Sequence, residues 1–240
     1  MPPRSGFTLV ELSIVLVIIG LLVGGVLAGK ALIQQAEIRA ATSQLQKFET
    51  AYNTFRLKYG CIMGDCANAT DFFGANYMSY ACTMPNGNGN GDGNGLIDSG
   101  GGGFWYCENE QASKSLALAN LLPTSLTNAC ISWAGVFKGI NDSCAIFYRD
   151  DLNGQVTPIK VNTIAWLGYE PISGILKAAA LSPVQARLID EKIDDGKPTT
   201  GKFRGLDYFS NSGLVSNSCS TSGAYNLNED YTCRSLYYLK

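Results

Sequence analysis

The hexapeptide Gly6-Phe7-Thr8-Leu9-Val10-Glu11 opens the longest apolar stretch of the chain, which continues to Gly29 as FTLVELSIVLVIIGLLVGGVLAG. Only one residue of this stretch is charged, Glu11. At 1.5 Å per residue, a helix of this length spans roughly 34 Å and can cross the hydrocarbon core of a bilayer. No other stretch of the sequence is both as long and as apolar. The sequence therefore predicts that the chain enters or crosses a membrane once, near its start.

Three interpretations of this stretch compete. A secretory signal peptide cleaved near Ala28 would have a shorter apolar region, of about 7–15 residues, and no carboxylate. A plain membrane anchor has the right length, but it leaves the carboxylate of Glu11 as an unexplained cost of roughly 2.5–3.5 kcal/mol. The third interpretation gives this carboxylate a partner.

Gly6-Phe7-Thr8-Leu9-Val10-Glu11, followed by an apolar helix, resembles the N-terminal signal of type IV pilins and type II secretion pseudopilins. The resemblance implies that a prepilin peptidase cuts after Gly6, removes residues 1–6 as a leader and methylates the new amine of Phe7. It also implies that Glu11 meets the N-terminal amine of a neighbouring subunit and sets the register of assembly. A buried amine and carboxylate cost less when paired. The sequence leaves open whether that pairing lies within one helix or between two.

The apolar helix, residues 7–29, is also suited to packing against other helices. Gly20 and Gly24 form one GxxxG pair, and Gly25 and Gly29 form another. Small residues at this spacing let membrane helices approach closely, although glycine is common in membrane helices in any case. The expected partners are the prepilin peptidase, other pilin or pseudopilin subunits and the inner membrane. The resemblance places residues 30–240 in the periplasm as a head, and at the cell surface after filament assembly.

The helix is expected to continue into the head. Its apolar residues recur at steps of three and four, which is the pattern of an amphipathic helix, and Gly60 is a plausible end. These residues are Ile38, Ala41, Leu45, Phe48, Tyr52, Phe55 and Tyr59. The stripe needs a surface to cover it, and a sheet from the same chain is the natural candidate. The expected fold is therefore α+β and pilin-like, with a long N-terminal helix packed on an antiparallel sheet that carries extra loops.

The remaining elements are predicted from local patterns. Residues 60–111 are expected to be irregular, and residues 112–122 to form a short helix stopped by Pro123. Ser182, Pro183 and Gln185 form a capping-box sequence that opens a second helix, which Gly196 ends. Runs of β-forming residues predict strands, and the tail to Lys240 is expected to be rich in turns. The predicted strands are Ile131–Lys138, Cys144–Arg149, Ile159–Leu167 and Lys202–Phe209.

Eight cysteines point to disulfides in an oxidising compartment. The absence of histidine excludes Ser-His-Asp and Cys-His catalysis and histidine-ligated zinc. Since short loops close at the least entropic cost, four local pairs are expected, although eight cysteines allow many other connectivities. The pairs are Cys61–Cys66, Cys82–Cys107, Cys130–Cys144 and Cys219–Cys233. The last pair resembles the C-terminal disulfide loop of many pilins.

A Gly/Asn tract has the spacing of a calcium loop. Oxygen-bearing side chains alternate at Asn90, Asp92 and Asn94, Gly95 allows a sharp turn, and Leu96 offers a carbonyl, as in an EF-hand loop. The twelfth position is a glycine, so Glu108 or Glu110 would have to supply the closing carboxylate. Residues 59–113 contain six acidic side chains, Asp98 among them, and no basic one, which favours a bound cation. The alternative is a flexible low-complexity loop.

These observations leave two classes of function. The first is a structural subunit, minor or specialised, of a type IV pilus or a type II secretion pseudopilus. The second is a membrane-anchored, calcium-stabilised binding or adhesion module that contacts a secreted substrate, a surface or DNA. The formal net charge of −2 gives no basic field to recruit nucleic acid, so no nucleic-acid partner is expected. No enzyme is expected either.

Overall fold

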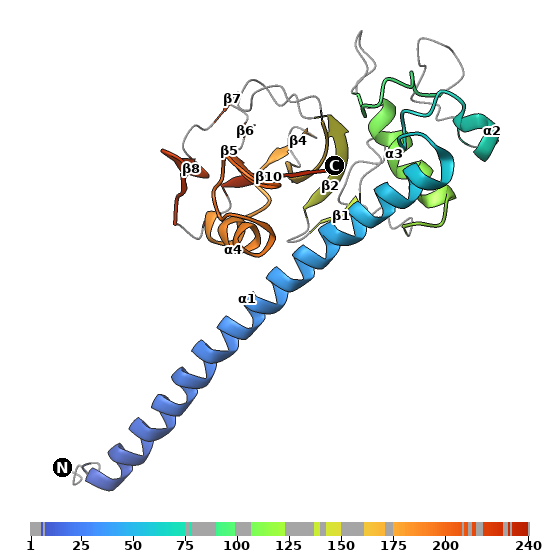
Figure 1. Cartoon of the computed structure of the whole chain (residues 1–240). Coiled ribbons are helices and arrows are strands. Elements are labelled where there is room, and N and C mark those ends of the chain that lie inside the picture. Colours follow the sequence, from blue (N-terminus) through green and yellow to red (C-terminus); the bar gives the residue numbers. More distant parts are fainter. Residues whose placement is uncertain are drawn as a thin grey trace. The chain divides into compact units, whose positions relative to one another are not determined.

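The computed structural model describes residues 6, 8–74, 77, 90–98, 107–122, 137–139, 143–149, 161–170, 175–207, 209–210, 213–214, 218–227, 230 and 232–239. The chain divides into two units, residues 1–40 and 41–240, which are described separately. Helix α1 (Leu9–Tyr59) begins in the first unit and ends in the second (Figure 1). The second unit carries all the strands found among the described residues and is called the head below.

The part of α1 in the head buries the apolar stripe predicted from the sequence. Its members are at most 4% exposed, which confirms the amphipathic pattern: Ala41, Leu45, Phe48, Tyr52 and Phe55. The helix ends at Tyr59, where the amide of Gly60 donates to the carbonyl of Arg56 at 3.0 Å. Gly60 has a φ of 71°, a left-handed conformation that glycine adopts without strain.

The core of the head is an antiparallel sheet, so the fold is α+β, as predicted. Its strands follow the order β1-β2-β3-β10-β5, and β4 pairs with the far end of β3. The C-terminal strand β10 lies between β3 and β5, with Leu236 opposite Ala165 on one side and Arg204 on the other. The bounds are Phe137–Lys138 for β1, Cys144–Arg149 for β2, Asn162–Glu170 for β3, Ile175–Ala178 for β4, Phe203–Asp207 for β5 and Cys233–Tyr238 for β10.

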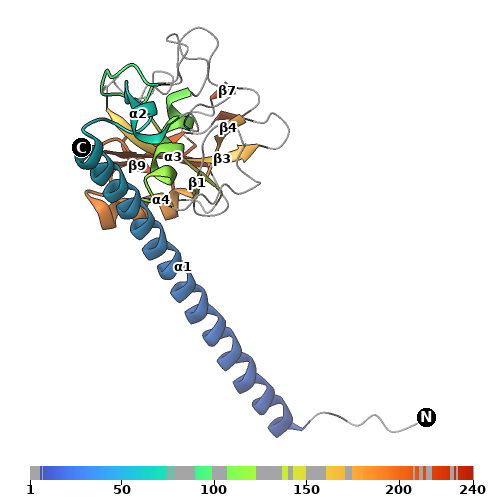
Figure 2. The same cartoon turned by 90° about the vertical axis from the view of Figure 1, so that its right-hand side faces the viewer.

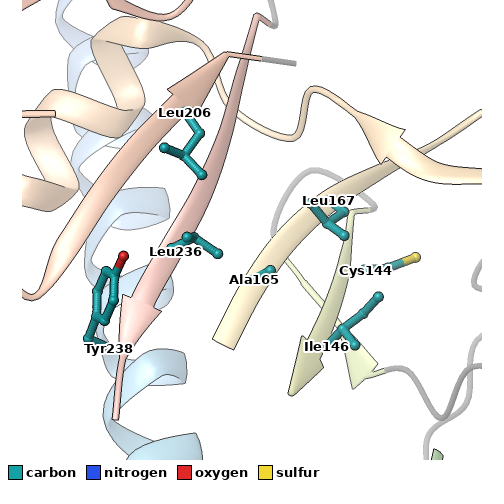
Figure 3. Close-up of a cluster of buried hydrophobic side chains, with 7 residues drawn as sticks. All are labelled: Cys144, Ile146, Ala165, Leu167, Leu206, Leu236 and Tyr238. Atoms are coloured by element: carbon teal, nitrogen blue, oxygen red, sulfur yellow. The ribbon is translucent and has the colours of Figure 1, made fainter. Parts of the chain in front are cut away.

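Alternate residues of these strands face opposite sides of the sheet. One side carries a buried apolar cluster contributed by β2, β3, β5 and β10 (Figure 3): Cys144, Ile146, Ala165, Leu167, Leu206, Leu236 and Tyr238. The other side receives α1. The ring of Phe48 lies 5.7 Å from that of Phe147 on β2 and 5.4 Å from that of Phe137 on β1. The aromatic stripe of α1 is therefore part of the core.

Polar contacts join α1 to the sheet at two positions along the helix, Glu49 and Tyr52. The ammonium group of Lys202 lies 2.5 Å from one carboxylate oxygen of Glu49, and the hydroxyl of Tyr237 donates to the other at 2.6 Å. One turn further along the helix, the side-chain amide of Asn162 donates to the hydroxyl of Tyr52 at 3.2 Å. These bonds join α1 to β10, β3 and the residue before β5. Such half-buried, well-oriented pairs define register more than they add stability.

The described part of the head also contains three short helices. Helices α2 (Ala69–Phe73) and α3 (Cys107–Leu118) lie near the C-terminal end of α1 (Figures 1 and 2). Helix α4 (Pro183–Ile193) packs against β5. Its start is the capping box predicted from the sequence, in which Gln185 and Ser182 bond each other's backbone amides. Two small hairpins follow, β6–β7 (Phe209–Ser210, Gly213–Leu214) and β8–β9 (Ser220–Thr221, Ala224–Tyr225).

Several predicted boundaries were wrong. The helix placed at residues 112–122 begins earlier, at Cys107, where Glu108 and Glu110 in its first turn stabilise a helix start, and it ends at Leu118. Strand β3 begins and ends three residues later than predicted, and β5 is shorter than predicted at both ends. Of the strand expected at Ile131–Lys138, only Phe137–Lys138 lies among the described residues. The tail was expected to be rich in turns, yet it also supplies β10. Both faces of β10 are buried, so its sequence lacks the apolar–polar alternation of an edge strand.

Candidate functional site

The N-terminal motif meets the start of α1 at Thr8 and Glu11. The backbone amide and the hydroxyl of Thr8 each donate to the Glu11 carboxylate at 2.8 Å, and the amide of Glu11 donates to the Thr8 hydroxyl at 3.3 Å. This reciprocal pattern is a capping box, which satisfies amides left unpaired at a helix start. Gly6, the residue before the expected cut, is exposed, and Phe7 lies outside the described residues.

The apolar part of α1 presents its side chains outward. Large apolar residues between Leu9 and Ile33 are at least half exposed, and the span is long and apolar enough to cross a membrane. No heavy atom outside the helix backbone lies within 4 Å of a β-carbon built at Gly20, Gly24, Gly25 or Gly29. Among the described residues, no side chain therefore covers the two GxxxG pairs that the sequence predicts to pack against other helices. Exposure of this much apolar surface is stable only against lipid or other protein.

A second candidate site lies in the head, where three carboxyl groups from distant segments converge. Oxygens of Asp65, Asp92 and Glu108 all lie within 4.8 Å of one another. Asp65 follows α1, Asp92 belongs to the Gly/Asn tract, and Glu108 lies in the first turn of α3. Asp65 and Glu108 are buried, while Asp92 is exposed and opens the cluster to solvent. Such an arrangement of carboxylates can hold a metal ion.

Asp65 organises the Gly/Asn tract around its side chain. One of its oxygens accepts hydrogen bonds from the amides of Gly93 and Asn94, and the other accepts one from Gly95, at 2.7–3.1 Å. Close backbone contacts make this possible: a β-carbon on Gly91 would lie 2.3 Å from the backbone of Asp65. The glycines of the tract are therefore required for a tight turn over one carboxylate, which a purely flexible linker would not need.

Glu108 closes the same turn from the other side. Its two carboxylate oxygens accept from the amide of Asp98 at 2.5 Å and from that of Asp92 at 3.4 Å. Burial raises the pKa of Glu108 to about 8 and that of Asp65 to about 6, and neighbouring carboxylates contribute, although the amide hydrogen bonds oppose the rise. The site thus concentrates negative charge that a proton or a cation must neutralise.

The residues predicted as metal ligands have different places in this structure. Asp92 and Glu108 belong to the carboxylate cluster, whereas Glu110 does not. The side-chain oxygen of Asn90 accepts from the amide of Thr70 at 2.9 Å, and that of Asn94 accepts from the amide of Leu96 at 2.8 Å. The side-chain amide of Asn94 donates to Asp92 and Asp98. Both asparagines therefore support the loop through hydrogen bonds.

Sequence reasoning missed Asp65 as a candidate ligand. It stands 25 residues before the start of the predicted loop, so no local spacing pattern includes it. One signal was present: Asp65 lies inside the short segment closed by Cys61 and Cys66, directly after Gly64. Gly64 has a φ of 85°, and a β-carbon there would lie 2.2 Å from the carbonyl oxygen of Glu108. This glycine lets the Asp65 turn approach α3.

Two of the four predicted cysteine pairs are confirmed. The structure joins Cys61 to Cys66 and Cys219 to Cys233, and Cys144 is also disulfide-bonded. Cys82, Cys130 and the side chain of Cys107 lie outside the described residues, so the other two pairs remain predictions. The first disulfide fixes the turn that carries Asp65. The second ties the β8–β9 hairpin to β10.

Comparison with known proteins gives one match. Residues 1–27 match the family model described as the prokaryotic N-terminal methylation motif, which is the signature of type IV pilins and pseudopilins. This match covers Gly6, Phe7, Thr8 and Glu11 and all but the last two residues of the apolar stretch 7–29. No curated protein and no solved structure gives a significant match to the chain.

Proposed function

We propose that this chain is the precursor of a filament subunit, minor or specialised, of a type IV pilus or a type II secretion pseudopilus. A prepilin peptidase removes residues 1–6 and methylates the amine of Phe7, and the mature subunit assembles through α1. The observation that carries this proposal is the methylation motif at residues 1–27 placed directly on an exposed apolar helix. In a filament subunit, such a helix first anchors the precursor in the membrane and then packs against the helices of neighbouring subunits.

The expected location follows from the same features. Before assembly, the apolar half of α1 holds the precursor in the inner membrane, with the head in the periplasm. The disulfides Cys61–Cys66 and Cys219–Cys233 support an oxidising compartment for the head, since such bonds rarely persist in a reducing cytosol. After assembly, the head lies on the surface of the filament.

Assembly is proposed to exchange the partners of Glu11. In the single chain, Thr8 satisfies the Glu11 carboxylate. Cleavage after Gly6 creates a charged amine at Phe7, and in the filament the amine of a neighbouring subunit would compensate the carboxylate more strongly than a hydroxyl can. The open glycine faces allow the close helix approach that this contact requires.

The experiment that tests this function is mass spectrometry of the mature N-terminus combined with filament isolation. The expected chain begins at an N-methylated Phe7 and is found in sheared filaments. Gly6→Val should retain Met1 and remain in the membrane fraction, while Gly20→Ala is a matched control that leaves the processing site intact. An intact Met1 in the wild-type protein, or a terminus near Gly29, would contradict the proposal.

The acidic cluster favours a calcium ion in the head, and with it a second candidate function, a membrane-anchored binding or adhesion module. We propose Asp65, Asp92 and Glu108 as the charged ligands, with the carbonyl of Leu96 and the carboxylate of Asp98 as possible additions from the same loop. Calcium takes six to eight oxygen ligands, so water would complete the shell. With few carboxylates, affinity should be modest, on the order of 10⁻⁴ to 10⁻³ M.

A further inference from the structure

The turn that follows α1 is closed by the disulfide between Cys61 and Cys66. Cys66 is fully buried, whereas Cys61 is partly exposed. In the disulfide between Cys219 and Cys233, by contrast, both cysteines are fully buried. A reductant must reach a sulfur atom in order to attack it, so the two bonds differ in how readily they open. Cys61 gives a reductant in solvent access to the first bond.

The same turn holds the Gly/Asn tract. The amide of Gly91 donates to the carbonyl of Cys66, and that of Gly93 donates to the carbonyl of Asp65, each at 3.0 Å. The carboxylate of Asp65 accepts three hydrogen bonds from amides of the tract, at 2.7–3.1 Å. The backbone of the tract is therefore bound to two consecutive residues, of which one forms the disulfide and the other lies inside the loop that the disulfide closes.

Electrostatic repulsion opposes the closed turn when no cation is bound. Carboxyl oxygens of Asp65, Asp92 and Glu108 lie within 4.8 Å of one another, and Asp65 and Glu108 are buried. Like charges at this distance repel each other, and a buried carboxylate regains its hydration when it moves into water. Outward movement of the Asp65 turn would relieve both costs. The disulfide acts against this movement, because a cross-link disfavours the open conformations of residues 61–66.

The far end of the tract is held by the sheet and not by the turn. The amide of Ile97 donates to the side-chain oxygen of Asn162 on β3 at 2.8 Å, and the side-chain amide of Asn162 donates to the carbonyl of Gly95 at 3.0 Å. These contacts do not involve the disulfide turn. Opening of the turn should therefore free residues 91–94, while the end of the tract and the sheet stay in place.

We propose that the Cys61–Cys66 disulfide is a redox-sensitive switch, whose reduction by a dithiol releases the Gly/Asn tract from the turn that carries Asp65. A thiolate of the reductant attacks the sulfur of Cys61, the S–S bond breaks, and the sulfur of Cys66 leaves as a thiolate and takes up a proton. The second thiol of the reductant attacks the mixed disulfide, displaces the sulfur of Cys61 and leaves the reductant as a disulfide. Two electrons and two protons thus pass from the dithiol to the two cysteines.

The first test is hydrogen exchange of the full-length chain in detergent, with chelator present so that no bound cation contributes. The Cys61→Ser/Cys66→Ser variant keeps both side chains small and polar but lacks the bond. The amides of residues 91–95 should exchange about tenfold faster or more in this variant than in the wild type, because the open turn is no longer disfavoured by a cross-link. The amides of β10 should keep their wild-type protection, which would show that the opening is local.

The second test is stepwise reduction of the wild-type chain with dithiothreitol, followed by alkylation and peptide mass spectrometry. Cys61 and Cys66 should be alkylated before Cys219 and Cys233, which serve as the internal control because both are buried. A sample alkylated without reductant controls for labelling that does not depend on reduction. Wild-type chain reduced at the first bond alone should show the same fast exchange of residues 91–95 as the double serine variant.

Each of three results would contradict the switch. The Cys61–Cys66 bond could open no sooner than the Cys219–Cys233 bond. Residues 91–95 could keep their wild-type protection after the first bond is removed. Protection of β10 could fall together with that of the tract, which would make the bond a support of the whole head. If the double serine variant does not fold, exchange in the selectively reduced wild type decides among these results.

Discussion

Thr8 and Glu11 cap each other at the start of α1. Three hydrogen bonds join their backbone amides and side chains, all within four residues of one helix. The carboxylate is therefore compensated inside a single chain before any neighbour is present. A neutral glutamine at position 11 could make the same capping box, because the box uses the side-chain oxygen and not its charge. Cap and charge can thus be separated by substitution.

The first prediction follows from this separation. Glu11→Gln should insert into the membrane and be processed like the wild type, yet appear in sheared filaments at a level reduced by about tenfold or more, since a buried amine without a counter-charge costs several kcal/mol. Glu11→Ala, which loses both cap and charge, should be no better. The measurement is the ratio of subunit in filaments to subunit in membranes. Wild-type incorporation of Glu11→Gln would show that the cap alone matters.

The second prediction concerns calcium. In the full-length protein, millimolar calcium should raise the melting temperature of the head relative to chelator, because an ion that binds only the folded state stabilises it. Asp65→Asn should abolish this rise. Glu110→Gln is the matched control, since Glu110 lies on the same helix as Glu108 but outside the carboxylate cluster, and should keep it. Identical melting curves for the wild type in both buffers would leave the loop without a metal role.

The sequence predicted those parts of the fold that follow from local periodicity. The stripe from Ala41 to Phe55 and the capping box at Ser182 were read correctly, because helix period and cap chemistry act over a few residues. Strand β10 was missed because it is buried on both faces, so Leu236 and its neighbours show no alternation. Only its pairing with β3 and β5, which are distant in sequence, defines it as a strand.

The acidic site, too, could be predicted only as far as it follows from local sequence patterns. Asp92 was predicted from a local spacing pattern, and Glu108 was one of two candidates for the closing carboxylate that the pattern lacks. Asp65 comes from another segment and joins them only through the fold. Local spacing also assigned Asn90 to a ligand position, but its oxygen accepts the amide of Thr70, a residue 20 positions away. A site assembled from three segments therefore needs the tertiary structure, while the N-terminal motif, which is contiguous, does not.

The third prediction is a pH dependence that calcium should offset. The pKa values of Asp65 and Glu108 are raised in the folded protein, to about 6 and about 8. Without metal, the folded state binds more protons than the unfolded state between the ordinary carboxyl pKa and these values, so stability should fall as pH rises toward 8. With calcium, proton loss permits metal binding, and the decline should flatten or reverse.

Thermal melting across this pH range, with calcium or with chelator, checks the dependence. Since burial also raises the pKa of Asp190 to about 8, the comparison is made in an Asp190→Asn background, which isolates the contribution of the loop. Subsequent Glu108→Gln should flatten the decline seen in chelator. A decline that is steeper with calcium than without it would have the wrong sign for a cation site.

The last prediction tests the close approach that builds the acidic site. Gly64 and Gly60 both have left-handed backbone conformations, with φ values of 85° and 71°. Alanine at either position meets the same conformational penalty, of about 1–2 kcal/mol. Only at Gly64 would the β-carbon also collide with α3, where it would lie 2.2 Å from the carbonyl oxygen of Glu108 and 2.9 Å from the amide nitrogen of Ala112.

Gly64→Ala should therefore destabilise the head by at least about 2 kcal/mol more than Gly60→Ala, measured by denaturant unfolding. It should also weaken calcium binding, because it moves Asp65 away from Glu108. Equal destabilisation by the two substitutions would mean that the Asp65 turn and α3 are not packed as described.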